Sequence, residues 1–357
     1  MDVRWGFIPL ISVLWCLEIR SGSPVRMPSF AIRGDISPLI EMDSINPTHS
    51  GSGYAGPMNR RAFLASAVSV ANVALPAATA QSRFTKSICS VIFPGDLPVS
   101  EKFRQARNAG FEGIEMRLGQ EMPMDSSPDE IKRIGDAARQ AGIRIASVWA
   151  SQPESQNPLN SRDAAVRARH LESLHRAIDI AAGLDCGAIL LVPGGLGGRR
   201  MNIGYMETWD LLSAELPKII PYAAEKKVIL TPEEVGNKFL TSPRDMRDFI
   251  DQYHSPYLQA HFDVGNIVLF GFPEDWILTL GPRIKRLHVK DYKFGGRGEP
   301  GRYVNLGEGD IDWPGVMAAL VKVGYNGFVS PEIGGDPNDP DKINKISRAL
   351  DKILSLA

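Results

Sequence analysis

Cysteine is scarce in this chain of 357 residues, which has three, and neither sign of charge is in excess, since the net charge is −1. Only Cys89 and Cys186 follow the N-terminal region, one in an apolar segment and one at the end of a helical pattern. The positions of these two cysteines predict buried free thiols and no disulfide framework. The sequence also has no prominent lysine or arginine block, which argues against nucleic acid or an anionic membrane as the main partner.

A glycine-rich nucleotide signature is absent as well. A doubly wound sheet normally carries the spacing G-x-G-x-x-G directly after its first strand. The nearest glycine cluster, within residues 192–198, follows the fourth strand-like segment and lacks that spacing. We interpret it as a mobile loop at the active end of the fold, with a phosphate cradle as the weaker alternative.

The N-terminal region differs from the rest of the chain. Arg60 and Arg61 precede an alanine- and valine-rich stretch that ends in the small residues 78–80. This order predicts a twin-arginine export signal over residues 58–80, too short for a confident membrane anchor and cleaved after Ala80. Residues 1–57 are then a disordered or mis-assigned extension, and Met58 is the predicted start. The predicted location is periplasmic, or cytoplasmic if residues 58–80 form an ordinary helix.

Residues 81–357 have the size of one barrel domain. Short apolar segments alternate with amphipathic segments whose apolar residues recur with a period near 3.6. Strands are predicted at residues 87–93, 113–118, 143–149, 188–192, 228–232, 258–263, 284–289 and 327–331. Helices are predicted at residues 100–109, 128–141, 163–184, 205–226, 243–253, 273–280, 313–323 and 341–356. Eight such units favour a (β/α)8 TIM barrel, with an open doubly wound sheet as the alternative.

Four acidic or imidazole side chains lie near the ends of the last four strands: Glu233, Asp263, His288 and Glu332. Alone, each would be interpreted as a solvated loop residue or a hydrogen-bonded core residue. Together they occupy equivalent points at the end of a barrel that holds the chemistry of barrel enzymes. Three converging carboxylates repel one another unless a cation joins them. Oxygen-rich ligation with one imidazole favours Mn²⁺, with Mg²⁺, Co²⁺ or Zn²⁺ as alternatives.

Several motifs give the chain a family resemblance. They are GFEGIE at 110–115, EEVGNKF at 233–239, FDVGN at 262–266, RLHVKD at 286–291, LGEGDIDW at 306–313 and GYNG at 324–327. With these motifs, the chain resembles the xylose isomerase-like TIM barrel family of sugar and sugar-phosphate isomerases and epimerases. It is most similar to the ketose 3-epimerase branch, which includes L-ribulose- and L-xylulose-5-phosphate 3-epimerases. The resemblance covers essentially all of residues 81–357.

The resemblance implies that Glu233, Asp263, His288 and Glu332 bind the metal and that the two glutamates also move protons. A metal chelated by a ketone oxygen and the neighbouring hydroxyl acidifies the C–H between them and stabilises the enediolate. One glutamate on each face of this metal-bound enediolate can remove a proton from one side and return one to the other, which inverts the carbon. If both steps used one face, the product would be an aldose–ketose isomer.

The sequence also predicts which side chains contact the substrate. Polar side chains near the strand ends are predicted to contact the sugar, against the alternative of local hydrogen bonding: Asn237, His261, Asn266 and Lys290. Glu115 is predicted to hold a sugar hydroxyl, with a helix cap or a salt bridge behind the site as alternatives. The chain departs from tagatose- and psicose-type epimerases, which have a histidine in place of Asn266 and an arginine in place of Phe294. Residues 294–302 are interpreted as a loop, either a flexible lid with an anion contact or simply solvated.

The predicted partner is therefore a small carbohydrate, and homo-oligomerisation is left open. A free or glycosidic ketosugar fits an exported enzyme, and a sugar phosphate fits a cytoplasmic one. Three other functions are weighed. A lyase, dehydratase or 3-keto-glycoside-cleaving enzyme would use the same site. A phosphodiesterase similar to endonuclease IV needs more histidines at the strand ends than this chain offers. A sugar-binding protein without catalysis is the third.

Overall fold

The computed structural model describes residues 83–150, 158–193, 203–296, 299–333, 336 and 339–357. The predicted extension and export signal, residues 1–80, lie outside the described residues, as do most of the glycine cluster and residues 297–298 of the predicted loop. Within the described part of the chain, no helix combines the length and hydropathy needed to span a bilayer.

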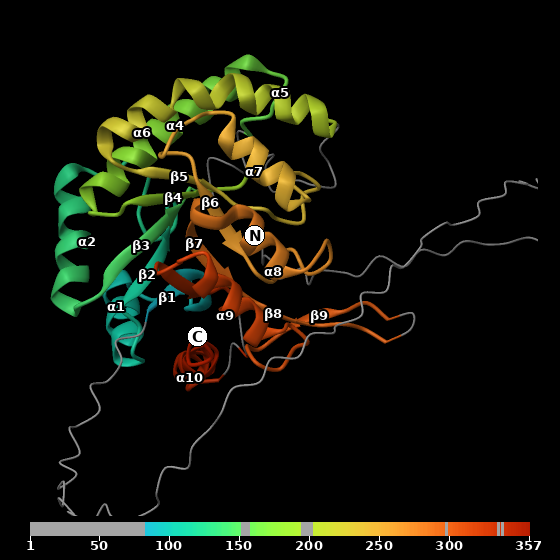
Figure 1. Cartoon of the computed structure of the whole chain (residues 1–357). Helices are drawn as coiled ribbons and strands as arrows, with labels where there is room; N and C mark the ends of the chain where they lie inside the picture. The colour runs from blue at the N-terminus through green and yellow to red at the C-terminus, as the bar shows by residue number, and fades with distance from the viewer. Residues whose placement is uncertain (1–82, 151–157, 194–202, 297–298, 334–335, 337–338) are drawn as a thin grey trace, which may run out of the picture. The chain divides into compact units, whose positions relative to one another are not determined.

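Eight parallel strands form the centre of the domain (Figure 1). They are β1 (Thr85–Cys89), β2 (Gly113–Arg117), β3 (Arg144–Trp149), β4 (Ala188–Leu191), β5 (Ile229–Pro232), β6 (Ala260–Asp263), β7 (Ile284–Val289) and β10 (Phe328–Pro331). Their order is β5-β4-β3-β2-β1-β10-β7-β6, and parallel bridges from Leu230 to Leu258 and from Glu233 to His261 join β5 to β6. The ring is thereby nearly closed, and the predicted (β/α)8 barrel is confirmed.

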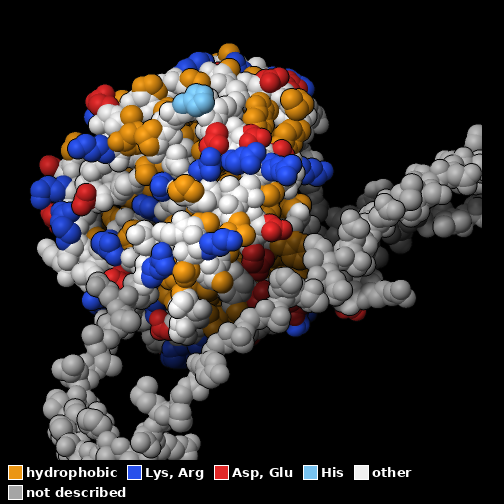
Figure 2. All heavy atoms as spheres, viewed as in Figure 1, with side chains coloured by type: hydrophobic (Ala, Val, Ile, Leu, Met, Phe, Trp, Pro, Cys, Tyr) orange, Lys and Arg blue, Asp and Glu red, His pale blue; other side chains and the backbone are white. Residues whose placement is uncertain are grey.

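Helices follow the strands and cover the outside of the barrel (Figure 1). They are α1 (Val99–Asn108), α2 (Pro128–Ala141), α4 (Ala164–Gly183), α5 (Tyr205–Glu215), α6 (Ile220–Lys226), α7 (Pro243–Asp251), α8 (Pro273–Leu280), α9 (Trp313–Lys322) and α10 (Lys342–Leu354). Short 3-10 turns are η1 (Ser90–Ile92), η2 (Leu216–Lys218) and η3 (Gly281–Arg283). The visible face mixes acidic, basic and apolar side chains (Figure 2).

Local chemistry explains where several helices begin and end. At the start of α2, the Ser127 hydroxyl accepts from the Glu130 amide while the Glu130 carboxylate accepts from the Ser127 amide, which satisfies two exposed donors. The helix ends at Gly142 with φ 69°, a conformation that glycine adopts without steric cost. The helix predicted over residues 205–226 is instead divided into α5, η2 and α6. Pro217 and Pro221 explain the division, because proline lacks the amide that a helix interior needs.

Two further differences from the sequence prediction lie near the active end. The first strand ends at Cys89, and Ser90–Ile92 form η1 instead of continuing to residue 93. Residues around the predicted 294–302 loop form an antiparallel hairpin of β8 (Asp291–Lys293) and β9 (Arg302–Val304). Among the described residues of the predicted loop, only Arg302 lies in a strand, and the others, 294–296 and 299–301, connect β8 to β9.

Asp291 ties the residues after this hairpin to the barrel. Its buried carboxylate Oδ2 accepts from the amides of Gly307 and Gly309, at 2.7 and 3.1 Å, and from the Trp313 indole at 3.1 Å. A side chain at Gly309 would collide with this carboxylate, because an added Cβ would lie 1.9 Å from Oδ1. The motif at 306–313 therefore has a structural role, since it fixes the path of the chain from the hairpin into α9.

Candidate metal centre at the carboxyl ends of the strands

The four predicted metal ligands come together in the structure. Glu233 directly follows β5, Asp263 ends β6, His288 lies in β7 and Glu332 directly follows β10. One potential ligand atom from each lies within 4.8 Å of the others. His288 Nδ1 is 3.1 Å from Glu233 Oε1, 3.4 Å from Glu332 Oε2 and 3.9 Å from Asp263 Oδ2. Four strands thus deliver three carboxylates and one imidazole nitrogen to one point.

Strand alternation explains why these side chains face inward. Phe262 packs against Trp276 of α8, with ring centroids 6.0 Å apart, so it faces the helix layer. Its neighbours His261 and Asp263 therefore point to the opposite side, the barrel interior. Asp263 is fixed further by its Oδ1, which accepts from the amides of Gly265 and Asn266 at 2.7 and 3.1 Å. Its other oxygen, Oδ2, is left to face the cluster.

The cluster is almost fully buried, and burial destabilises the charged form of its carboxylates. Glu233, Asp263 and His288 are at most 4% exposed, and the Glu332 side chain is 23% exposed. Burial raises the pKa of Glu233 to about 7, although His288 acts in the opposite direction. Burial would also raise the pKa of Glu332, but the charge of Lys290 outweighs it and lowers that pKa. The two carboxylates therefore have different proton affinities in this structure.

Lys290 supplies a positive charge directly to two of the three carboxylates. Its Nζ lies 2.6 Å from both Asp263 Oδ2 and Glu332 Oε2, and 3.1 Å from the amide oxygen of Asn266. Burial would lower the pKa of Lys290, but the charge of Asp263 and then that of Glu332 hold it well above its usual value. Lys290 and Asn266, predicted as substrate contacts, are therefore joined to the carboxylate cluster.

The donor set fits a divalent cation. Three carboxylates and one imidazole match the ligands of Mn²⁺ or Mg²⁺ sites, and none of the four is a sulfur donor. One lysine cannot neutralise three carboxylates that lie this close together, and a cation of charge two would complete the balance. Glu233, Asp263, His288 and Glu332 would hold the ion.

The other three predicted substrate contacts are already bonded or enclosed within the protein. Glu115 is 3% exposed and lies against His288, with its Oε2 3.2 Å from His288 Nε2. His261 is 1% exposed, and its ring centroid is 4.1 Å from that of His288. Asn237 donates to the carbonyl of Pro193 at 2.7 Å and accepts from the Phe239 amide at 3.1 Å. Glu115 and His261 thus line the barrel interior behind His288.

Sequence reasoning missed three residues around the cluster. Glu234 accepts from the backbone amide of Asp263 at 2.7 Å, and the Cys89 thiol lies 3.3 Å from His288 Nε2. Tyr303 of β9 is half-exposed, and burial, followed by the charge of Asp263, raises the pKa of its phenol. The adjacency of Glu234 to Glu233 was a usable signal. No sequence pattern indicated Tyr303, because its proximity to Asp263 depends on where the hairpin lies in the folded protein.

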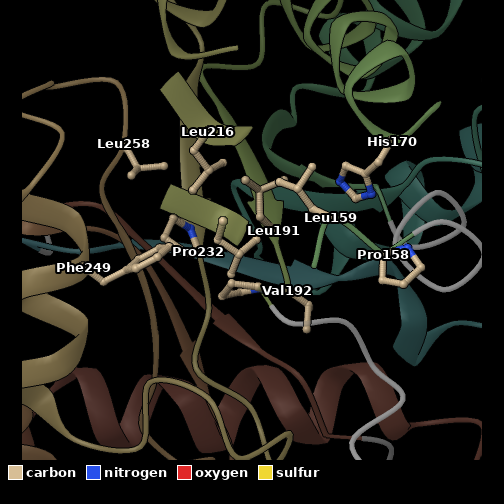
Figure 3. A pocket seen from close by; sticks show the side chains of 11 residues that line it. Pro158, Leu159, His170, Leu191, Val192, Leu216, Pro232, Phe249 and Leu258 are labelled. Carbon is tan, nitrogen blue, oxygen red and sulfur yellow. The ribbon is translucent and has the colours of Figure 1, made fainter. Parts of the chain in front are cut away.

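The apolar cavity in Figure 3 is lined by none of the four cluster residues. Its volume is about 20 Å³, enough for a water molecule and far too small for a monosaccharide. Leu191 and Pro232 line it from the ends of β4 and β5, and helix residues such as Leu216 and Phe249 complete it. It is a packing gap between strands and helices.

A comparison with known protein families agrees with the fold. The model of the xylose isomerase-like TIM barrel family matches residues 103–353. The chain belongs to this family. The family's description as a TIM barrel agrees with the eight parallel strands described above.

Related proteins indicate the enzyme class of this xylose isomerase-like barrel. An L-ribulose-5-phosphate 3-epimerase of Salmonella paratyphi C (strain RKS4594) is 27% identical over 254 residues, which cover 68% of this chain and 86% of the relative. The crystal structure of a D-psicose 3-epimerase with D-fructose superposes with a TM-score of 0.65 at 18% identity, covering 75% of this chain and 98% of that one. A 3-keto-D-glucoside 4-epimerase from Escherichia coli has a TM-score of 0.62 at 15% identity, covering 76% and 99%. The Salmonella relative is named as an epimerase, and the predicted enzyme class, an isomerase, is confirmed by it. The two solved structures show that the fold is shared.

Proposed function

We propose that this protein is a divalent-metal-dependent sugar epimerase of the ketose 3-epimerase type, with Mn²⁺ as the preferred ion. The observation that carries the proposal is the convergence of Glu233, Asp263, His288 and Glu332 within 4.8 Å. The epimerase relatives support the reaction class. Bound here, the ion would act as a Lewis acid toward the ketone and the neighbouring hydroxyl of the sugar.

The barrel places the two glutamates on opposite flanks of the cluster. Glu233 follows β5 and Glu332 follows β10, and β6 and β7 lie between these strands in the ring. Asp263 and His288 therefore lie between the two glutamates, and a planar sugar intermediate bound at the cluster would have one glutamate on each side. Glu332 can remove the proton from one face and Glu233 can return one to the other, which inverts the carbon. Lys290, at 2.6 Å from Glu332, can stabilise the carboxylate form of that glutamate.

The substrate is proposed to be a ketosugar. A ketone beside a hydroxyl-bearing carbon is required, because only that arrangement acidifies the C–H that must exchange. Asn266 and Lys290 are retained as proposed sugar contacts because both lie beside the ligand carboxylates. Asn237, His261 and Glu115 are weaker candidates, since each already contacts other protein groups.

The test is a screen of ketoses, ketose phosphates and 3-keto-glycosides with Mn²⁺-loaded protein in D₂O, followed by NMR. Epimerisation is expected to incorporate one deuterium at the inverted carbon and to give no unsaturated product. An unsaturated product or a released aglycone would show that the site catalyses an elimination. The protein would then be the lyase or the 3-keto-glycoside-cleaving enzyme. The absence of any turnover across all three substrate classes would contradict the proposal.

We also propose that residues 58–80 form a twin-arginine export signal, with support from the sequence order Arg60-Arg61, apolar stretch and Ala78-Thr79-Ala80. Expressed in a bacterium with this export pathway, the protein should be recovered from the periplasm with Gln81 as its first residue. Replacing both arginines by lysine is expected to retain an uncleaved precursor in the cytoplasm. Wild-type protein that stays uncleaved in the cytoplasm would contradict export and would favour a phosphorylated sugar as substrate.

A further inference from the structure

A buried carboxylate lies directly behind the proposed metal ligand His288. Glu115, in the middle of β2, is 3% exposed, and its Oε2 is 3.2 Å from His288 Nε2. β2 and β7 are not neighbours in the sheet, because β1 and β10 lie between them. The contact therefore crosses the barrel interior, and it joins residues that are 173 positions apart in the sequence.

Glu115 is itself held in place. The hydroxyl of Ser147, on the neighbouring strand β3, donates to Glu115 Oε2 at 2.5 Å. Ser147 is 1% exposed, so solvent does not compete for this bond. The Cys89 thiol, at 3.3 Å from His288 Nε2, fills the remaining side of this nitrogen. Three strands thus fix the surroundings of one imidazole nitrogen.

The two nitrogens of His288 consequently face opposite environments. Nδ1 faces the carboxylates of Glu233, Asp263 and Glu332, whereas Nε2 faces Glu115. A neutral imidazole carries one proton, and the nitrogen that binds a metal must offer its lone pair. For Nδ1 to be that nitrogen, the proton must be on Nε2. In a buried environment the Nε2–H group needs an acceptor, and the Glu115 carboxylate provides it.

We propose that Glu115 is a positioning residue that accepts the Nε2–H of His288, and so fixes the tautomer and the ring orientation that present Nδ1 to the cation. The inference rests on the metal site of the proposed function. It assigns Glu115 to His288, which is the salt-bridge alternative of the sequence analysis, in place of the predicted sugar contact. Carboxylates that orient a metal-binding histidine in this way typically contribute about 10–100-fold to metal affinity.

The experiment compares Glu115→Met with Glu115→Gln. Methionine removes the acceptor at nearly the same length, while the amide oxygen of glutamine can still accept from Nε2. Titration of chelator-treated protein with Mn²⁺ by calorimetry is expected to show a Kd raised about 10–100-fold for Glu115→Met. Glu115→Gln is expected to raise it only a few-fold. Glu112→Gln serves as the control, because this side chain lies just before the same strand and is 51% exposed.

Two further measurements separate positioning from sugar binding. ¹⁵N NMR of the imidazoles should show His288 protonated at Nε2 in the wild type, with that signature weakened in Glu115→Met. At saturating Mn²⁺, Glu115→Met should keep the KM of the wild type. A raised KM together with an unchanged Kd for Mn²⁺ would mean that Glu115 contacts the sugar, and would overturn the inference.

The remaining outcomes are also distinguishable. If the wild type binds Mn²⁺ and Glu115→Met binds it equally well, this inference fails while the proposed function stands. If the wild type binds no divalent ion, the proposed function fails first. Should Glu115→Met not fold, Ser147→Ala tests the same chain of contacts, because it removes the donor that holds Glu115. Two results together would then overturn the inference. One is a Kd for Mn²⁺ in folded Ser147→Ala and Glu115→Gln that equals the wild-type Kd. The other is a wild-type His288 that is protonated at Nδ1.

Discussion

Replacing Glu332 by glutamine is expected to reduce epimerisation by roughly 10³-fold, because one side chain both holds the cation and transfers a proton. The amide has nearly the same shape as the carboxylate but cannot take up a proton. It also removes the negative charge that lies 2.6 Å from Lys290 Nζ and 3.4 Å from His288 Nδ1. Turnover is measured by NMR with the best ketosugar from the screen.

Deuterium exchange shows which half of the reaction is lost. If Glu332 removes the proton from one epimer, Glu332→Gln should abolish exchange into that epimer. Glu233→Gln should abolish deuterium exchange into the other epimer. Glu308→Gln is the matched control, because Glu308 is exposed and its carboxylate accepts a hydrogen bond from Asn305 outside the cluster. Wild-type turnover in Glu332→Gln would exclude this residue as a proton carrier and would favour another reaction mechanism, whereas a wild type without any turnover would favour a binding protein.

Removal of the metal should have a comparable effect. Treatment with EDTA is expected to reduce activity at least roughly 10²-fold, because a Lewis acid contributes several kcal/mol to catalysis and about 1.4 kcal/mol corresponds to a factor of ten. Activity should return with Mn²⁺ or Co²⁺. Without the ion, Lys290 is the cation bonded to Asp263 and Glu332, and it leaves the charge of the cluster incompletely balanced.

Thermal unfolding gives an independent measure of the same site. At 100 times its Kd, a ligand that binds only the folded state stabilises it by about 2.7 kcal/mol, which corresponds to a rise in Tm of roughly 5 °C for a domain of this size. His288→Ala is expected to abolish this rise, whereas Glu112→Gln should keep it. Equal activity and equal Tm with EDTA and with Mn²⁺ would contradict the metal site.

The barrel was predictable because its signals are local. Each strand is a short apolar segment, and each helix carries its own periodicity and often its own stop signal, such as Gly142 after α2. In a parallel barrel, equivalent strand ends meet at one rim. Residues near the ends of four strands, such as Asp263 and Glu332, could therefore be placed together from the sequence. The family motifs extended this to the reaction class.

The sequence by itself determined the fold, the family and the four residues that converge, because these depend on periodicity and on position along each strand. Only the tertiary structure decided which side chains touch across the barrel. Glu115 meets His288, and Lys290 meets Asp263 and Glu332, because of strand register and the inward direction of each side chain. The hairpin of β8 and β9 also depended on packing, since Asp291 bonds to residues 16 and 18 positions further along the chain. Such partners are set by distances in space, which no local pattern records.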